Sequence, residues 1–425
     1  MELKKYKLGD IAEIYISSID KKSKEGEQSV RLCNFVDIYH NWAITKDLVP
    51  NFMIASANDN NIKRFSLKEG YVAFTKDSET RDDIGIPAYI ADDLDNTVLG
   101  YHCALVKPNA DILSGKYLNT FLHSDYIKKY FELNATGSGM RYTLSTETLS
   151  NIPILVPSLE MQEYIGNIFS NIDRKICLNR QINDNLEAMA KQLYDYWFVQ
   201  FDFPNEEGKP YKSSGGAMVY NEKLKREIPQ GWTAAKIKDV AQTYSGGTPT
   251  STNSEYYDGG NIPWINSGEL NNSIITSTTN YITEEGLKNS SAKLYPQDTI
   301  LVALYGATAG KVSLLSFEAC SNQAVCGVIP PNKIMTTYIR YYLFSLYEHF
   351  ITLSSGSARD NISQETIKNT ILPIPQEKIL KEYSDAVAPI ISKTIANQKE
   401  MENLTKQRDE LLPLLLNGQA SVNAD

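Results

Sequence analysis

The sequence predicts an α+β protein in which a globular domain and the long helix that follows it occur twice. Three observations predict this fold class. One stretch of the chain repeats without gaps, two stretches carry heptad-spaced apolar residues, and short β-branched and aromatic runs lie between Gly, Pro, Asn and Asp. We therefore expect two duplicated globular α/β domains and two long α-helices packed as an antiparallel coiled coil. The expected segments are a first domain at 1–157, a first helical segment at 158–205, a second domain at 206–375 and a second helical segment at 376–425.

The repeat is clearest where each globular domain ends. Residues 136–157 (TGSGMRYTLSTETLSNIPILVP) align with residues 354–375 (SSGSARDNISQETIKNTILPIP) at a shift of 218. This shift pairs Arg141 with Arg359 and continues into the helical segments. Upstream the likeness is weaker, which indicates that the two domains have diverged more than the elements that connect them.

Each helical segment carries a stripe of residues at spacings of four and three, which is typical of helices that pack along a seam. We expect Pro389 to kink or interrupt the start of the second helix, because proline breaks the backbone hydrogen-bond ladder. The two stripes are Ile165, Phe169, Ile172, Ile176, Asn179, Asn183, Leu186, Ala190, Leu193 and Trp197, and Tyr383, Val387, Ile390, Thr394, Asn397, Met401, Leu404, Arg408, Leu411 and Leu415.

Asn179 and Asn397 hold matching places near the middle of the two stripes. In an antiparallel pair of helices the two side chains could meet, and a buried Asn pair fixes the register of a coiled coil. The alternative is that each Asn is a solvated flank residue. In that case Ile182, Met189 and their counterparts form the helix contact.

The segments between the helices have the pattern of strands and turns. The expected strands lie at 71–75, 86–90, 103–107, 298–304, 311–315 and 324–329. One helix-like stretch follows in each domain, at 116–133 and at 337–353. Each domain is therefore expected to be α+β with a twisted sheet.

Composition limits the classes of function. The net charge is −9 and each of the four expected segments is net negative, so any surface for nucleic acid must be local. Five scattered cysteines show no metal-ligand spacing, and we expect no metal site. No apolar run approaches the length of a membrane span, so we expect a cytoplasmic protein with no membrane partner.

The stretch YGATAGKVS at 305–313 superficially resembles a phosphate-binding loop. That loop needs four residues between its glycines and Ser or Thr after Lys. Here only three residues separate Gly306 from Gly310, and Val312 follows Lys311. We expect a tight turn between strands, with Thr308 and Lys311 available to a phosphate backbone, and no nucleotide site. No methyltransferase motif is evident and the chain has only four His, so no catalytic residue is expected.

Several motifs in a fixed order carry a family resemblance. They are GGTPTSTNSEYYDGGNIPWINSGEL (246–270), YGATAGKV (305–312), CSNQAVCGVIPP (320–331), GSARDNIS (356–363) and the terminal RDELLPLLLNGQ (408–419). Together with the duplicated plan, the chain resembles the specificity subunits of type I restriction–modification enzymes. The first domain departs most from this pattern, since it lacks the GTP, IPW and GATAG segments.

The resemblance implies a non-catalytic DNA-binding subunit. Each domain would be a target recognition domain that reads one half of a bipartite site in double-stranded DNA. The helices would set the spacer between the half-sites and dock two modification (methyltransferase) subunits, through which restriction (ATP-dependent nuclease) subunits join. This chain would bind no cofactor: AdoMet is expected on the methyltransferase partner, and ATP and Mg on the restriction partner.

Two alternatives stay open at this stage. The acidic charge is compatible with a duplicated, non-enzymatic binding module for a ligand other than DNA. A self-contained DNA-modifying enzyme is the other alternative, against which the missing cofactor and catalytic motifs count.

Residues that touch DNA are expected on loops, because base edges are read by Arg, Lys and amide or hydroxyl side chains that reach into a groove. Matched loops end the two domains and carry Arg141 with Tyr142, and Arg359 with Asn361. Either these arginines contact DNA, or they bind a carboxylate where the domain meets its helix.

Residues that set the recognised sequence should differ between the two domains. The remaining candidates in the first domain are Lys76 and Arg81, with Lys63, Arg64 and His102 as further choices, although His102 is more typical of a structural histidine. The candidates in the second domain are Thr248, Thr250, Ser251, Asn253, Tyr256, Thr308, Lys311 and Gln323, whereas Trp264 is expected in the core.

Overall fold

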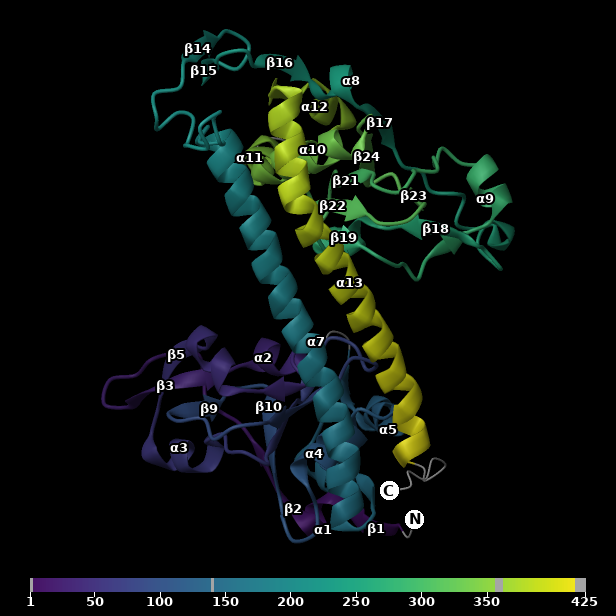
Figure 1. Ribbon diagram of the computed structural model, residues 1–425. Coiled ribbons are helices and arrows are strands. Elements are labelled where there is room, and N and C mark those ends of the chain that lie inside the picture. The colour runs from purple at the N-terminus through teal and green to yellow at the C-terminus, as the bar shows by residue number, and fades with distance from the viewer. Residues whose placement is uncertain (1–2, 139–140, 356–361, 417–425) are drawn as a thin grey trace. The chain divides into compact units, whose positions relative to one another are not determined.

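The computed structural model describes residues 3–138, 141–355 and 362–416, and the chain divides into two compact units (Figure 1). Unit 1 comprises Met1–Leu178 and Glu402–Asp425, and unit 2 comprises Asn179–Met401. Each unit therefore contains one globular domain together with a part of each long helix. No helix within the described residues is long and apolar enough to cross a membrane.

The domain in unit 1 is built on a five-stranded sheet in the order β2-β10-β6-β8-β4. Neighbouring strands are antiparallel except for β4 and β8, which are parallel. A three-stranded sheet β5-β3-β9, a small sheet β11-β12-β7 and the pair β1-β13 complete it. The strands are β1 (Lys4–Lys7), β2 (Ala12–Ile16), β3 (Gln28–Cys33), β4 (Ala43–Ile44), β5 (Met53–Ala57), β6 (Val72–Thr75), β7 (Asp77–Ser78), β8 (Pro87–Ile90), β9 (Thr97–Leu99), β10 (Cys103–Pro108), β11 (Thr136–Ser138), β12 (Arg141–Thr143) and β13 (Pro153–Val156).

Short helices cover this domain. The stretch expected to be helical at 116–133 forms two helices rather than one, because the Ser124 side chain caps the second by accepting a hydrogen bond from the Ile127 amide at 3.4 Å. The helices are α1 (Leu8–Ile11), α2 (Phe35–Tyr39), η1 (Lys46–Asn51), α3 (Asp59–Phe65), α4 (Gly115–Leu122), α5 (Asp125–Asn134) and α6 (Thr146–Ser150).

The domain in unit 2 repeats the same topology. Its five-stranded sheet runs β17-β24-β21-β22-β19, again with one parallel pair at the end, β19 with β22. The second sheet β20-β18-β23 matches β5-β3-β9, and β16-β25 matches β1-β13. The strands are β14 (Met218–Asn221), β15 (Arg226–Pro229), β16 (Thr233–Lys236), β17 (Gln242–Ser245), β18 (Ile262–Ile265), β19 (Ile274–Ile275), β20 (Tyr281–Ile282), β21 (Ile300–Ala303), β22 (Val312–Leu315), β23 (Cys320–Ser321), β24 (Val325–Ile329) and β25 (Ile371–Ile374).

The helices of unit 2 also follow those of unit 1. The stretch expected at 337–353 is again divided into two helices, which end and begin on either side of Leu346. The helices are α8 (Ile237–Val240), η3 (Ser254–Tyr256), η4 (Ser267–Asn271), α9 (Glu284–Lys288), α10 (Lys333–Ser345), α11 (Tyr347–Ser355) and α12 (Gln364–Asn369).

The residues that the repeat preserves have the same structural task in both copies. Ser145 caps α6 by accepting from the Thr148 amide, and Ser363 caps α12 by accepting from the Thr366 amide, both at 3.0 Å. The repeated Ser-x-x-Thr is therefore a helix start, which explains why it survived while the neighbouring loops diverged.

The two long helices are α7 (Leu159–Tyr194), which continues into the π-helical turn η2 (Asp195–Val199), and α13 (Glu377–Leu416). None of the twenty stripe residues is exposed, which confirms the heptad interpretation. The prediction that Pro389 interrupts the second helix is wrong. Pro389 and Asp385 both lie on the exposed side of α13. The Asp385 carbonyl loses its helical partner but can bond to water. The helix continues because Tyr383 and Val387 on its other side are buried in the core.

Within unit 2 the two helices run antiparallel. Asn179 donates to a carboxylate oxygen of Glu400 at 2.9 Å, and one turn further along α7 the Asn183 side chain accepts from Asn397 at 2.9 Å. The predicted meeting of Asn179 with Asn397 is therefore wrong, since each pairs with a residue about one turn away. The solvated alternative is also wrong, because Asn179 and Asn397 are buried and Ile182 and Met189 are exposed.

Candidate nucleic-acid interface

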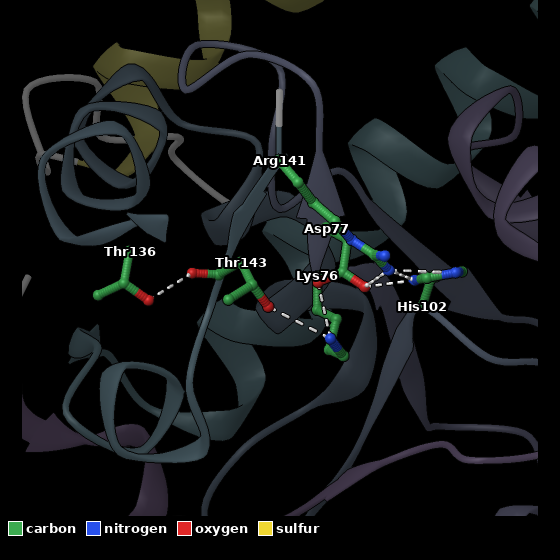
Figure 2. Close-up of polar contacts among 6 residues, drawn as sticks. All are labelled: Lys76, Asp77, His102, Thr136, Arg141 and Thr143. Atoms are coloured by element: carbon green, nitrogen blue, oxygen red, sulfur yellow. Dashed lines mark hydrogen bonds and ion pairs between the residues drawn. The ribbon is translucent and has the colours of Figure 1, made fainter. Parts of the chain in front are cut away.

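In the first domain, two backbone hydrogen bonds join three loops that lie far apart in the sequence. The Lys76 amide donates to the His102 carbonyl at 2.9 Å, and the Leu144 amide donates to the Lys76 carbonyl at 2.8 Å. These bonds bring the end of β6, the turn before β10 and the end of β12 together. Lys76, His102 and Arg141, three of the predicted residues, consequently meet at one place (Figure 2).

Asp77 is the centre of this cluster. One of its carboxylate oxygens accepts from the Lys76 ammonium at 2.7 Å, and the other is in contact with His102 Nδ1 and lies 3.3 Å from the Arg141 guanidinium (Figure 2). Its side chain is only 8% exposed. Burial raises the pKa of Asp77, but hydrogen bonds from Lys76, Thr143 and His102 outweigh burial and lower that pKa to about 2. The carboxylate is therefore charged at neutral pH and holds three cationic or donor groups.

The Lys76 side chain is fixed from two sides. Its ammonium also donates to Thr143 Oγ1 on β12 at 3.2 Å, and it is 12% exposed. The predicted contact with DNA would therefore require Lys76 to leave two partners. Arg141 is freer, with a side chain that is 59% exposed.

Arg141 does bind a carboxylate, as the alternative interpretation expected, but not at the junction between domain and helix. The carboxylate belongs to Asp77 on β7, which pairs with β12 so that Thr143 lies opposite Asp77. Beside it, the exposed Arg81 places its guanidinium over the ring of Tyr142, 5.0 Å from the centroid. Three predicted first-domain residues, Lys76, His102 and Arg141, thus contact one acidic residue that sequence reasoning missed.

Lys63 and Arg64 lie elsewhere in the first domain. Both sit in the last turn of α3, and the Arg64 guanidinium lies over the ring of Tyr15, 4.8 Å from the centroid. The structure therefore does not bring these two further choices into the Asp77 cluster.

The second domain has the same backbone framework with different side chains. The Leu304 amide donates to the Ala324 carbonyl and the Ile362 amide donates to the Leu304 carbonyl, both at 2.7 Å. Leu304 and Ala324 therefore stand where the first domain has Lys76 and His102. Tyr305, the next residue, corresponds to Asp77. The predicted Arg359 and Asn361 lie outside the described residues.

Two predicted residues of the second domain are in direct contact. The Thr248 hydroxyl donates to the side-chain oxygen of Gln323, and both residues are exposed. The preceding glycines allow this approach, because a Cβ on Gly246 would lie 2.1 Å from the Asn322 carbonyl oxygen. The Trp264 indole N–H donates to the Gly247 carbonyl at 3.0 Å, so this partly buried residue of β18 supports the loop.

The Gly306–Gly310 segment is the turn between the antiparallel strands β21 and β22, as predicted. Both glycines have positive φ, +85° and +79°. The expectation that Thr308 is available to a phosphate is wrong, because Thr308 is 5% exposed and its hydroxyl donates to the Ser267 carbonyl at 2.9 Å. Lys311 is partly buried and donates to the Asn271 side chain at 2.5 Å.

The remaining second-domain candidates lie in the segment that follows the glycines. Thr250 and Ser251 are exposed, and Tyr256 is partly buried. The Asn253 side chain caps η3 by accepting from the Glu255 amide at 3.2 Å, which is a structural task. Thr248, Thr250, Ser251 and Gln323 are thus the predicted residues that remain most accessible to a ligand.

The chemistry available at these loops is hydrogen-bond donation and charge. Among the described residues no group of three His, Cys, Asp or Glu side chains could hold a metal ion. Burial raises the pKa of the Cys103, Cys320 and Cys326 thiols to about 12, so none of the three is a nucleophile at neutral pH.

Comparisons with known proteins agree with this architecture. Residues 1–188 and 229–406 match the family described as the type I restriction modification DNA specificity domain. The chain is 28% identical over 406 residues to the type I restriction enzyme HindI specificity subunit of Haemophilus influenzae, covering 83% of this chain and 87% of that one. It is 27% identical over 399 residues to the MjaIX specificity subunit of Methanocaldococcus jannaschii, covering 90% and 87%.

Among solved structures, the chain is similar in fold to the S subunit of a type I restriction–modification system from M. genitalium. The TM-score is 0.58, and the match covers 97% of this chain and 96% of that chain. The sequence identity is 13%, so this likeness concerns the fold.

Proposed function

Since the chain belongs to the type I restriction modification DNA specificity family, we propose that it is the sequence-specificity subunit of a type I restriction–modification complex. It carries out no chemistry itself. Each globular domain reads one half of a bipartite site in double-stranded DNA. The domain limits 1–157 and 206–375, with helical segments at 158–205 and 376–425, are part of this proposal.

One observation carries the proposal: the same backbone framework occurs twice in one chain and carries different side chains. The first domain presents Lys76, Asp77 and His102 where the second presents Leu304, Tyr305 and Ala324. A duplicated binder of one ligand would be expected to keep the side chains as well as the backbone. Different side chains on a preserved backbone are what two different half-sites require.

The helices supply the other part of the function. Buried Asn contacts between α7 and α13 fix their register, and a fixed register sets the unread spacer between the half-sites. On its outer side α7 exposes Ile182 and Met189, at 42% and 57%. We assign this face to docking of two modification subunits, with restriction subunits joining through them. AdoMet then belongs to the modification partner, ATP and Mg to the restriction partner, and the complex to the cytoplasm.

The test is methylome mapping in cells that express this chain together with the methyltransferase of its own system. The expected result is a split DNA motif with one methylated adenine in each half, and no such motif when the methyltransferase is expressed alone. Methylation that is independent of this chain, or DNA binding that is indifferent to sequence with the methyltransferase present, contradicts the proposal.

Residue-level support comes from the second domain. Gln323→Ala removes an exposed amide that is held by Thr248 and should alter one half of the motif only. Gln242→Ala is a matched control, because this exposed glutamine lies on strand β17 of the same domain and its side chain accepts a hydrogen bond from the nearby Tyr244. A change in both halves with Gln323→Ala would indicate a loss of fold rather than of reading.

A further inference from the structure

We propose that Asp77 and His102 are positioning residues that orient Arg141 toward a guanine in the half-site read by the first domain. The inference rests on the proposed function and adds to it the base that is read and the residues that fix the reader. It also limits this device to one of the two domains.

The first step is that Asp77 is a rigid support. Its backbone lies in β7, opposite Thr143 of β12, and Arg141 belongs to the same strand β12. Its carboxylate is 8% exposed and is held by Lys76. Because support and arginine sit on neighbouring strands of one sheet, the guanidinium has a defined direction even though 59% of the Arg141 side chain is exposed.

The second step is the kind of contact that a supported arginine makes. The Asp77 carboxylate offsets one of the two positive charges of Lys76 and Arg141, which weakens the attraction of the cluster for a phosphate at a distance. It keeps its fork of N–H donors, and only one terminal nitrogen of Arg141 contacts Asp77 and His102. Guanine presents two acceptors, O6 and N7, in the major groove, and this pair matches an arginine fork. Orientation serves base reading, whereas a backbone contact requires mainly charge.

His102 can replace the arginine on Asp77. His102 Nδ1 contacts the Asp77 carboxylate and also lies 2.6 Å from the Arg141 nitrogen. One ring nitrogen cannot donate to the carboxylate and accept from the guanidinium at the same time. When guanine draws Arg141 away, Nδ1–H is free to donate to Asp77, so the buried carboxylate keeps its partners and the arginine leaves without leaving a charge unpaired.

Within the described residues, the second domain lacks both supports of this device. A purely structural ion pair would be expected wherever the duplicated framework recurs. The framework does recur, yet Tyr305 and Ala324 stand in place of Asp77 and His102, and neither can bind a guanidinium through a carboxylate or a ring nitrogen. His102 has φ of +71°, an unfavourable conformation for a non-glycine residue, which is consistent with a side chain retained for its position.

The experiment compares DNA discrimination by the full chain in complex with its methyltransferase, using duplexes that carry single base-pair changes in the mapped motif. Wild type should lose about 5- to 150-fold in affinity when one G·C pair of one half-site becomes A·T. Asp77→Asn, which keeps the shape and removes the charge, should reduce that loss to a few-fold and leave discrimination in the other half unchanged. Glu79→Gln makes the same charge change two residues away on an exposed side chain and should behave as wild type.

Two further variants separate a specific effect on base reading from a loss of fold. His102→Asn removes the ring while asparagine tolerates positive φ, and it should weaken discrimination at the same G·C pair. Arg141→Lys should abolish discrimination there while keeping much of the overall affinity, because lysine retains the charge but not the fork.

Three results would overturn the inference alone. In the first, Arg141→Lys alters recognition of a half-site that contains no G·C pair. In the second, Asp77→Asn and Glu79→Gln discriminate equally well. In the third, Asp77→Asn weakens discrimination in both half-sites to the same extent. If wild type shows no split motif and no sequence preference, the proposed function itself fails, and that result is distinct from the other three.

Discussion

The first and second domains can be compared residue by residue, because equivalent backbone hydrogen bonds hold equivalent loops in both. The amides of Lys76 and Leu304 each donate to a carbonyl in the turn before β10 or β24, and their carbonyls each accept from a residue that precedes a capping serine. At three matched positions of this common backbone the first domain has Lys76, Asp77 and His102, whereas the second has Leu304, Tyr305 and Ala324. The comparison teaches that the two copies kept the same main-chain hydrogen bonds, whereas the side chains at those positions changed.

A second difference between the two domains lies in the core, at the residue two positions after a buried tyrosine. Tyr117 of α4 donates to the Leu155 carbonyl and Tyr338 of α10 donates to the Pro373 carbonyl, which are equivalent positions. The residue two positions later is Asn119 in the first domain and Arg340 in the second. Arg340 is 2% exposed and binds Glu187 of α7 at 2.9 Å, so a buried ion pair ties the second domain to its helix, and the described part of the first domain shows no counterpart.

The largest effect should come from breaking that ion pair. Arg340→Ala leaves the Glu187 carboxylate buried without its partner, which typically costs about 3–5 kcal/mol. Amide hydrogen exchange of unit 2 should increase, beginning with α10. Asn119→Ala is the matched change in unit 1 and should cost about 1 kcal/mol, since the Asn119 side chain makes one hydrogen bond, to the Trp42 carbonyl at 3.2 Å. Equal destabilisation of the two units by these variants would contradict the inference that the buried ion pair stabilises the second domain more strongly than the Asn119 hydrogen bond stabilises the first.

The helix pair offers the next test. Asn397→Leu leaves the side-chain oxygen of Asn183 without its donor in a buried seam and should lower the free energy of unfolding by about 1–3 kcal/mol. The double variant Asn183→Leu/Asn397→Leu should recover most of that loss, because both polar groups are then replaced together. Asn403→Leu, on an exposed position of α13, is the control and should change stability little. Denaturant unfolding of wild type, the single variants Asn183→Leu and Asn397→Leu, the double variant and the control measures the coupling; additive effects of the two single changes would contradict the pairing.

Most of the fold follows from periodicity, whereas the polar partners do not. The heptad stripes and the β-branched runs predicted the long helices and central strands, because burial leaves its mark at regular spacing. The alignment of the repeat suggested that Asn179 meets Asn397, yet an alignment carries no information on how two antiparallel helices interlock. Packing shifted the contacts by about one turn, to Asn183 and Glu400.

The site was predicted in part for the same reason. Cationic and amide residues on loops were found, and Lys76, His102 and Arg141 do meet. Asp77 was missed because an acidic residue does not suggest a DNA surface, although its place next to Lys76 at the end of a strand was visible in the sequence. Thr308 was misjudged because the carbonyl that buries it, that of Ser267, lies 41 residues away.

The charge of Asp77 should appear in the pH dependence of unit 1. Its pKa of about 2 in the folded chain lies below the ~3.9 of an unfolded aspartate. The ionised form therefore stabilises the folded state above about pH 4, and this stabilisation is lost as the pH falls from about 4 through about 2. The effect is at most about 2.6 kcal/mol, because each pKa unit corresponds to about 1.4 kcal/mol. Asp77→Asn should remove this component of the acid sensitivity, and unfolding measured from pH 2 to pH 5 tests it, with Glu79→Gln as control.

The smallest effects are expected at the two helix caps that both domains share. Ser145→Ala and Ser363→Ala each remove a helix cap and should each cost about 1 kcal/mol, because both hydroxyls accept from an amide at 3.0 Å. Thr146→Ala, at an exposed neighbouring position, should change stability by less than about 0.5 kcal/mol. Hydrogen exchange at α6 and α12 reports the two caps separately. If the two substitutions lower the free energy of unfolding by markedly different amounts, hydrogen bonds of equal length differ in energy. The two domains would then share the geometry of the framework but not its contribution to stability.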